Sequence, residues 1–382
     1  MTLQSDNYFL AQPKIALIRM DRMGDLLCTL PVDQGNYPIT FHWIISKNLG
    51  FIVDLAEQSR NFTEFELSGN INNINTLTSF LKNEKFDAAI VFHAPAWVSF
   101  AIWKAGIPLR FGPKSQWHQF IFLNQTLRQK RNKSILHEAD YNFELFKWAI
   151  NIFKINKEIC AKKNTYSEIK NVTIIEDKSI HQTQNSIEFE FQFPSTTPFF
   201  RFKKLDLSNA PVSSLLQKPY IVIHPGMGGS ALNWSQIKYI ELIQIFLEQN
   251  YIVVITGTES DTRWLTEISN FCSDKKNVCW LVGELTGQDL ITVLQNAQGV
   301  IAPSTGVIHL AAACQVPSIG LYSPLRVQSS TRWAPRSEVS NSITPKVNCP
   351  SPSKCQKEKC KFYPCLDLIN PKDVFNKLIN FF

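Results

Sequence analysis

Apolar and polar residues follow a pattern along this chain that predicts strands alternating with helices, in two separate series. In the first series, apolar runs of strand length lie at 14–20, 40–46 and 86–92, and each precedes a stretch with apolar residues at helical spacing. A second series begins at 220–226 and continues to 317–323. Short strands alternating with helices predict an α/β protein with two parallel, doubly wound sheets.

Length and composition agree with two globular domains. The chain has 382 residues, of which 44% are hydrophobic and 19% are charged, and this length exceeds that of an ordinary single domain. We place an N-terminal domain at 1–206, with a less regular segment at 155–206, and a C-terminal domain at 207–366. The remaining stretch, 367–382, has the pattern of an amphipathic helix.

The ends of several predicted strands carry residue types that suit a phosphorylated ligand. The sequence HPGMGGSALNW at 224–234 joins a strand to a helix, and VIAPSTGVIH at 300–309 does the same. Free backbone N–H groups at a helix N-terminus attract anions, although glycine-rich turns and N-caps also occur for purely structural reasons. The candidate ligand-binding residues at these strand ends are Gly226, Met227, Gly228, Gly229, Glu259, Ser304, Thr305, Gly306 and His309.

Asp25 is the candidate catalytic residue of the first series. It follows Gly24 where the first strand ends and a helix begins, at the edge of a doubly wound sheet that usually binds ligands. A carboxylate there suits a general base. The same position also suits an aspartate that only stabilises the start of a helix.

The cysteines divide into two groups. Five of the nine are scattered through predicted core elements, as expected of reduced thiols, whereas Cys349, Cys355, Cys360 and Cys365 lie within seventeen residues. Their spacing is wider than that of common zinc sites. A structural metal, a disulfide pair, and a packed or surface role all remain open for these four.

The segment from Ala88 to His137 is basic and aromatic. It contains no Asp or Glu, and its seven Lys and Arg residues equal the net charge of +7 of the whole chain. Cations interleaved with aromatic rings suit an anionic amphiphile at a membrane surface, whereas the alternative is an aromatic core bordered by solvated cations. No nucleic-acid-binding module is visible.

No targeting or membrane-spanning segment is expected. The N-terminus lacks a basic region followed by an apolar one. The most apolar window, 88–107, is interrupted by His93, Pro95 and Lys104. These features favour a cytoplasmic protein.

Taken together and in this order, IALIRMDRMGDLLCTLP, HPGMGGSALNWS, ITGTESD and VIAPSTGVIHLAAACQVPSIGLY resemble the heptosyltransferases of lipopolysaccharide core assembly, glycosyltransferase family 9. The segments RFGPKSQWHQFIFLN and LHEADYNFELFK resemble the acceptor side of that family. The resemblance covers most of the chain. It implies a GT-B fold, with two Rossmann-like domains facing each other across a cleft and a C-terminal helix at 367–382 that packs back on the first domain.

The resemblance also implies an activity: inverting transfer of heptose from ADP-heptose to a lipopolysaccharide inner-core acceptor, with no obligatory metal or other cofactor. Asp25 corresponds to the catalytic aspartate of the family, and Glu259, Thr305, Gly306 and His309 correspond to donor-site residues. The partners implied are a sugar nucleotide, an anionic glycolipid and the inner-membrane surface, with no nucleic acid. The candidate acceptor-binding residues are Arg22, Arg110, Lys114, Arg128, Lys130 and Arg131.

Two positions depart from the family pattern. Ser304 stands where many members have Asp, and Leu232 stands where a Lys or Arg usually pairs with the donor diphosphate. Two alternatives therefore accompany the heptosyltransferase interpretation. One is a family 9 enzyme with another sugar nucleotide, and the other is a non-catalytic GT-B protein that binds lipid or saccharide.

Overall fold

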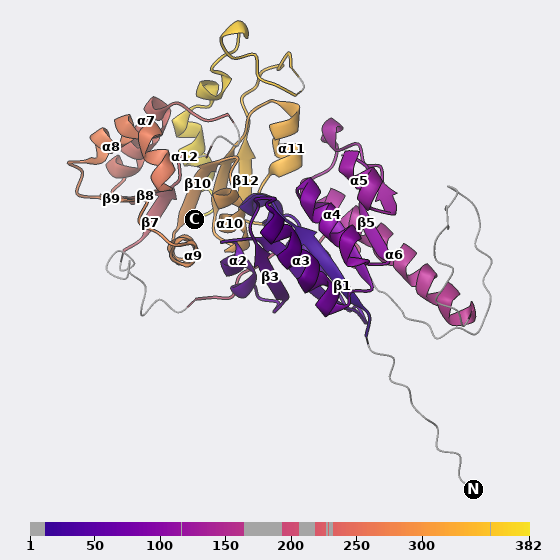
Figure 1. The fold of residues 1–382 in the computed structure, drawn as a ribbon. Helices are drawn as coiled ribbons and strands as arrows, with labels where there is room; N and C mark the ends of the chain where they lie inside the picture. The colour runs from indigo at the N-terminus through magenta and orange to yellow at the C-terminus, as the bar shows by residue number, and fades with distance from the viewer. Residues whose placement is uncertain are drawn as a thin grey trace.

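The structure is a computed structural model that describes residues 12–115, 117–163, 193–205, 218–226, 228, 232–351 and 353–382. Figure 1 shows two lobes, one built from the indigo to magenta part of the chain and the other from the orange to yellow part. Each lobe contains a six-stranded sheet. The two parallel sheets confirm the predicted α/β class and the GT-B arrangement.

The first sheet has the strand order β3-β2-β1-β4-β5-β6, with all pairs parallel. The strands of this lobe are β1 Lys14–Arg19, β2 Thr40–Ser46, β3 Asn61–Phe65, β4 Ala88–His93, β5 Leu109–Pro113 and β6 Gln125–Leu127. Its helices are α1 Met23–Leu27, α2 Gly50–Asp54, α3 Ile71–Glu84, α4 Ala96–Ala105, α5 Trp117–Phe122 and α6 Glu138–Lys163.

The second sheet has the order β12-β11-β10-β7-β8-β9 and is also parallel throughout. Its strands are β7 Tyr220–Ile223, β8 Ile252–Gly257, β9 Val278–Val282, β10 Gly299–Pro303, β11 Ser318–Leu321 and β12 Ser340–Ile343. The helices of this lobe are α7 Gln236–Glu248, α8 Thr266–Cys272, α9 Gly287–Gln295, α10 Gly306–Ala313, α11 Ser330–Trp333 and α12 Pro371–Ile379.

Both sheets share one topology. The strand order reverses between β1 and β4 in the first sheet and between β7 and β10 in the second. In doubly wound sheets, ligands bind outside the carboxyl ends of the strands at this reversal. The loops after β1 and β10 are therefore the expected binding loops of the two lobes.

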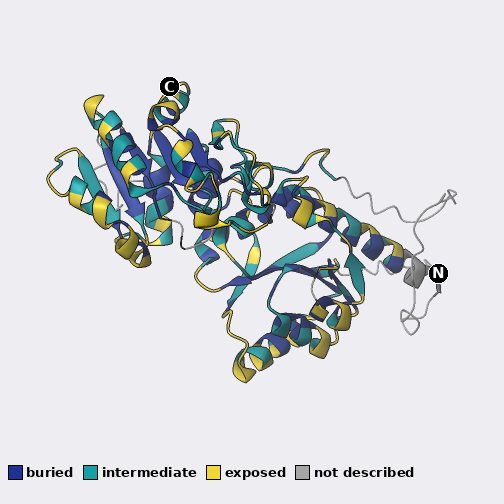
Figure 2. Cartoon of the chain, turned by 90° about the horizontal axis from the view of Figure 1, so that it is seen from above, coloured by how far each residue is buried: buried dark blue, intermediate teal, exposed yellow. Residues whose placement is uncertain are grey.

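The central strands are buried on both faces, as parallel strands between two helical layers must be. Ile15, Leu17, Ile221 and Ile223 are fully buried, and Figure 2 shows dark-blue strands in the interior of the second lobe, with partly exposed helices around them. The loops after β1 and β10 begin directly at the ends of these buried strands.

The two lobes meet where α1 packs against α10. A Cβ added at Gly24 would lie 3.1 Å from Cδ2 of His309, and one added at Gly306 would lie 3.0 Å from Sδ of Met23. The two glycines thus permit the N-termini of α1 and α10 to approach each other. The loop after β1 and the loop after β10 consequently face the same space.

The C-terminal helix corrects one expectation. The resemblance implied that 367–382 packs on the first domain, but α12 packs on α7 and β11 of the second. The rings of Phe246 and Phe375 lie 5.0 Å apart, and Leu378 covers Gly299. The apolar face of α12, with Val374 and Leu378 fully buried, completes the second core.

Two further expectations concern the middle of the chain and the membrane. Helix α6 continues to Lys163, inside the segment 155–206 that was expected to be less regular, and most of the residues between Lys163 and β7 lie outside the described part of the chain. Within the described ranges, no helix combines the length and the apolar character that a membrane crossing requires.

Candidate active site

A cleft with a cavity volume of about 590 Å³ lies between the lobes. The first lobe contributes Arg22, Met23 and Gly24 after β1, together with Asn48, Leu49 and Phe51. The second lobe contributes loops that follow β7, β8, β9 and β10. A cleft of this size at the carboxyl ends of two sheets is large enough for a small ligand such as a nucleotide.

The N-terminus of α10 forms one wall of the cleft. Thr305 is the N-cap residue, and its hydroxyl oxygen is buried without a hydrogen-bond partner among the described residues. Thr305 and Gly306 both line the cleft. Free N–H groups at the start of this eight-residue helix, together with the hydroxyl, are suited to bind an anion.

The glycine-rich loop after β7 is held by Asp261. A Cβ at Gly226 would lie 2.6 Å from Oδ2 of Asp261, and Gly228 has a φ of +52°. Asp261 also accepts hydrogen bonds from the backbone N–H (2.9 Å) and the hydroxyl (2.6 Å) of Thr258. Burial raises the pKa of Asp261, but these hydrogen bonds and the one from Gly228 outweigh it and lower the pKa.

Sequence reasoning missed Asp261, although a signal for it was present. Thr258 and Asp261 form a capping box, a pattern that can be recognised from a Thr followed three residues later by an acid. Gly228 lines the cleft and Gly226 lines a neighbouring pocket, whereas Met227 and Gly229 lie outside the described residues.

The remaining predicted donor residues have different surroundings. Glu259 is exposed and lines the cleft. The hydroxyl of Ser304 forms a hydrogen bond with the side chain of Tyr322, which belongs to the same lobe. His309 is buried against Gly24, and its Nδ1 lies 3.8 Å from Sγ of Cys28. Burial lowers the pKa of His309 to about 3, so its ring is neutral at physiological pH.

Asp25 lies beside the cleft, one residue beyond Gly24, with its side chain one-fifth exposed. Its Oδ1 accepts a hydrogen bond of 2.5 Å from Nη2 of Arg19. Nε of Arg19 donates to Asp21 over 2.8 Å. A single buried guanidinium therefore fixes both carboxylates at the end of β1.

The pKa of Asp21 shows how strongly burial acts at this point. Burial raises this pKa to about 7, although the guanidinium of Arg19 opposes the shift. Asp21 is therefore partly protonated near neutral pH, while Arg19 remains charged because its pKa is raised. The pKa of Asp21 also responds to the charges of Arg19, Asp25 and Glu138.

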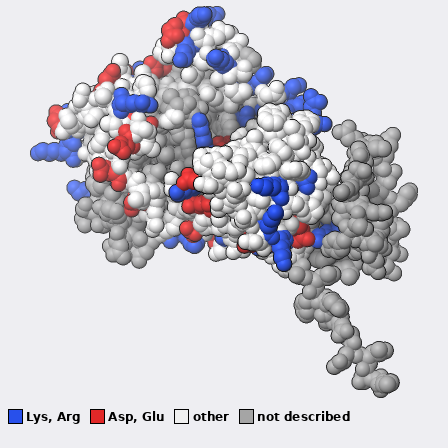
Figure 3. Space-filling model, in the orientation of Figure 1, with Lys and Arg blue, Asp and Glu red and all other residues white. Residues whose placement is uncertain are grey.

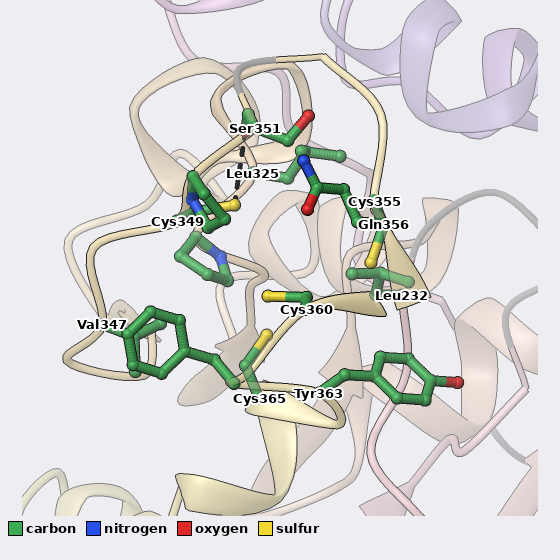
Figure 4. Close-up of a pocket in the computed structure, with 13 residues that line it drawn as sticks. Leu232, Leu325, Val347, Cys349, Ser351, Cys355, Gln356, Cys360, Tyr363 and Cys365 are labelled. Atoms are coloured by element: carbon green, nitrogen blue, oxygen red, sulfur yellow. Dashed lines mark hydrogen bonds between the residues drawn. The ribbon is translucent and has the colours of Figure 1, made fainter. Parts of the chain in front are cut away.

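Leu232 lies away from the cleft between the lobes. Its side chain lines a separate pocket with Pro324, Leu325 and the four C-terminal cysteines. Figure 4 shows Leu232 next to Cys355 and Cys360, with the thiols of the cysteines directed into the same space. An apolar residue at 232 is thus explained by an apolar neighbourhood.

The four cysteines are free thiols. Burial raises the pKa of Cys365, and the three other cysteines add to the effect. Within the described part of the chain, no group of three or more His, Cys, Asp or Glu side chains has an arrangement that could hold a metal ion.

The predicted acceptor-binding cations fall into two groups. Arg22, Lys114, Arg128 and Lys130 are exposed. By contrast, the guanidinium of Arg110 donates to the backbone oxygens of Phe122 (2.7 Å) and Ile107 (2.6 Å). Arg131 forms an ion pair of 2.6 Å with Glu138.

Exposed aromatic residues lie near Lys114, whose Nζ is 5.2 Å from the ring centre of Phe120. Trp117 is 69% exposed, and Phe120 and Trp103 are also largely exposed, on α5 and α4. Figure 3 shows Lys and Arg atoms along the edge of the first lobe next to α5. Cations and exposed rings therefore share one edge of the first lobe.

Two parallel six-stranded sheets of this order, with a cleft lined by loops of both lobes, define a GT-B protein. The sequence pattern of glycosyltransferase family 9 (heptosyltransferase) matches residues 74–364. The chain belongs to this family and is a glycosyltransferase.

Relatives by sequence include a protein of Haemophilus influenzae named "Putative glycosyltransferase", which is 25% identical over 346 residues. This match covers 89% of the chain and 90% of the relative. Lipopolysaccharide heptosyltransferase 2 of Salmonella typhimurium is 26% identical over 156 residues, covering 40% of the chain and 44% of that protein.

Two solved structures show the same fold. ADP-heptose lps heptosyltransferase II of E. coli superimposes with a TM-score of 0.67 at 18% identity, covering 96% of the chain and 98% of that structure. The E. coli heptosyltransferase WaaC with ADP gives a TM-score of 0.61 at 15% identity, covering 97% and 100%.

The position of Leu232 leads to a prediction. We expect Leu232→Lys to leave the affinity for a sugar nucleotide unchanged or lower, because the new cation enters the cysteine pocket and not the cleft. Desolvation of the ammonium group should destabilise the protein by about 1 kcal/mol, which lowers Tm by about 2–4 °C. Calorimetry for binding and a thermal scan for Tm measure both effects.

The matched control is Leu232→Met, which nearly conserves volume and should leave both values close to those of the wild type. Tighter binding of the sugar nucleotide by the Lys variant would contradict this placement, since it would show that position 232 reaches the cleft.

Proposed function

We propose that this protein transfers heptose from ADP-heptose to a hydroxyl of a lipopolysaccharide inner-core acceptor, with inversion at the anomeric carbon. The observation that carries the proposal is the approach of α1 and α10, which brings Gly24, the residue before Asp25, to the same cleft as Thr305 and Gly306. A base and a leaving-group site facing each other are what a single displacement requires.

The donor is proposed to bind mainly to the second lobe. The diphosphate binds at the N-terminus of α10, where N–H groups and the Thr305 hydroxyl stabilise the charge that develops as the nucleotide leaves. Glu259 accepts hydrogen bonds from the ribose or base. The identity of the heptose and the nucleotide rests on family membership and on the names of the related proteins.

Asp25 is proposed to accept the proton of the acceptor hydroxyl as it attacks. Arg19 holds its Oδ1, so that the second oxygen, Oδ2, is the one available to the acceptor. His309 is neutral and buried beside Gly24, where it supports the contact between the lobes and carries no positive charge into the site.

The experiment that tests the donor is calorimetric titration with ADP-heptose and with UDP-, GDP- and ADP-linked hexoses. Preferential binding of ADP-heptose supports the proposal. Preferential binding of another member of the panel would assign a different donor to the same fold, and binding of none would favour a non-catalytic role.

The role of Asp25 gives a prediction. Asp25→Asn removes the base but keeps the shape, so kcat should fall by about 100-fold or more, while the Kd of the donor changes by less than a few fold. Single-turnover kinetics and donor titration separate the two effects. Turnover close to that of the wild type would exclude Asp25 as the base.

Arg22 is proposed to supply the positive charge that the donor diphosphate requires. Among the described Lys and Arg residues, it is the one that lines the cleft, next to Met23, which contacts Gly306. We therefore assign this residue to the donor, although the sequence groups it with the acceptor side. Because Arg22 is exposed, solvent screens its charge.

We predict that Arg22→Gln weakens donor binding by about tenfold, since a screened charge-assisted hydrogen bond contributes roughly 1.5 kcal/mol. The matched control is Arg263→Gln, because Arg263 lies over the ring of Trp264 in the neighbouring pocket. Titration with the donor and with its nucleoside alone measures the difference. Equal donor affinities for the two variants would exclude Arg22 from the diphosphate site.

The acceptor is proposed to approach from an inner-membrane surface along the edge of the first lobe that carries α4 and α5. Exposed indole and phenyl rings suit the membrane interface, and cations suit the phosphates of an anionic glycolipid. Lys114, Arg128 and Lys130 have exposed side chains on this edge, whereas the internal bonds of Arg110 and Arg131 give these two a structural role.

We predict that neutralising Lys114, Arg128 and Lys130 together weakens binding to anionic vesicles by roughly 3 kcal/mol at low salt, at about 1 kcal/mol for each cation. The KM of the acceptor should rise and that of the donor should not. Added salt should reduce the difference. Vesicle sedimentation like that of the wild type at low salt would exclude these cations from membrane binding.

A further inference from the structure

Glu138, the first residue of α6, gathers three arginines from three separate elements. It is 2% exposed. Its Oε1 lies 2.6 Å from Nη1 of Arg131 and 3.7 Å from Nη1 of Arg19. Its Oε2 accepts hydrogen bonds from Nε (3.1 Å) and Nη2 (3.0 Å) of Arg332. The mechanism proposed above does not use this buried carboxylate.

The cluster around Glu138 combines three arginines with three acidic side chains. Arg19, Arg131 and Arg332 face the carboxylates of Asp21, Asp25 and Glu138. Burial raises the pKa of Glu138, but the three arginines outweigh it and lower the pKa. Removal of one partner from such a buried cluster leaves charge uncompensated, which makes each member sensitive to the others.

The geometry connects the two lobes to the base. Arg332 belongs to α11 of the second lobe, whereas Arg19 at the end of β1 holds Asp25. The same end of α6 makes two more contacts with the second lobe, from His137 to the carbonyl oxygen of Ala334 (2.9 Å) and from Asp140 to Arg336 (2.7 Å). Of the three residues that make these contacts, only Glu138 also faces Arg19.

We propose that Glu138 is a positioning residue, which fixes the orientation of Asp25 through Arg19. Because Glu138 also binds Arg332, the orientation of Asp25 depends on the position of the second lobe relative to the first. The inference rests on the proposed role of Asp25 as base. Nη1 of Arg19 has no hydrogen-bond partner among the described residues, so Glu138 acts on this guanidinium through charge.

Charge in this region also controls ionisation. Glu138 raises the pKa of Asp21, after the larger effects of burial, Arg19 and Asp25. Glu138→Gln removes a negative charge, so the ionisation of Asp21 should move to lower pH. The titratable and charged groups that face these carboxylates are Arg19, Cys28, His93, Arg131, Glu138, His309 and Arg332.

The chain offers a matched control in Asp140→Asn. Asp140 also forms an ion pair with the second lobe from the start of α6, but it does not contact Arg19. If Glu138 only holds the lobes together, both variants should behave alike. If Glu138 positions Asp25, only its own replacement should affect the base.

With ADP-heptose and a lipid A-type inner-core acceptor, Glu138→Gln should lower kcat by about 100-fold and leave the donor Kd within a few fold. The acid limb of its pH–rate profile should move to lower pH. Glu138→Asp keeps the charge but shortens the side chain. It should lower kcat but leave the acid limb of the pH–rate profile near its wild-type pH. Asp140→Asn should stay within a few fold of the wild type, with an unmoved limb.

Arg332→Gln tests the link between the lobes in a protein that keeps Glu138, Arg19 and Arg131. It should lower kcat while donor affinity is retained. Turnover like that of the wild type would overturn the dependence of Asp25 on the second lobe, even if Glu138→Gln fails to fold.

A readout without turnover is the ¹³C-carboxyl NMR titration of Asp-labelled protein, with Asp21 and Asp25 assigned from their Asn variants. The Asp25 resonance should change in Glu138→Gln and not in Asp140→Asn. Equal changes in both variants, or none in either, would overturn the proposal. Wild-type turnover retained in Asp25→Asn would instead reject Asp25 as the base, and with it the proposed mechanism.

Discussion

The structure of the active site depends on one buried guanidinium, that of Arg19 at the end of the first central strand. Arg19 holds Asp21 and Asp25 on one side and faces Glu138 on the other. Desolvation makes a buried arginine costly unless carboxylates surround it. The position of Asp25 is consequently set by a network of ion pairs and not by a surface loop alone.

This constraint explains why the lobes meet where they do. Gly24 and Gly306 allow α1 and α10 to approach closely. Glu138 of α6 adds a second contact between the lobes, through its ion pair with Arg332 of α11. In the proposed mechanism, the base comes from one lobe and the groups that bind the diphosphate come from the other. If these groups meet only when the two lobes are in the correct relative position, the enzyme protects a reactive donor from hydrolysis by water.

Much of the fold follows from the sequence because the central strands are buried on both faces. Runs such as 14–20 and 251–257 are continuous and apolar, which is the pattern of a parallel strand. Strand β3 and helix α3 did not give this signal. Sheet edges and solvent-facing helices contain polar residues, as Asn61–Phe65 and Ile71–Glu84 do, so periodicity alone does not identify them.

Residues that line the cleft could be identified from the sequence where a strand ends in a glycine-containing turn before a helix, as at Gly24 or at Thr305 and Gly306. The site was not predictable where partners are distant in sequence. Glu138 and Arg332 are separated by 194 residues, and the environment of Leu232 is formed by a segment more than a hundred residues later. These pairs depend on how two lobes and a C-terminal segment pack together.

A crystal structure of the protein soaked with ADP tests the central claim most directly, because that claim assigns the nucleotide to the cleft between the lobes. The account predicts the diphosphate at the N-terminus of α10, hydrogen-bonded to Thr305 and within reach of Arg22, with the ribose next to Glu259. ADP bound in the neighbouring pocket beside Trp264, with the cleft unoccupied, would contradict it.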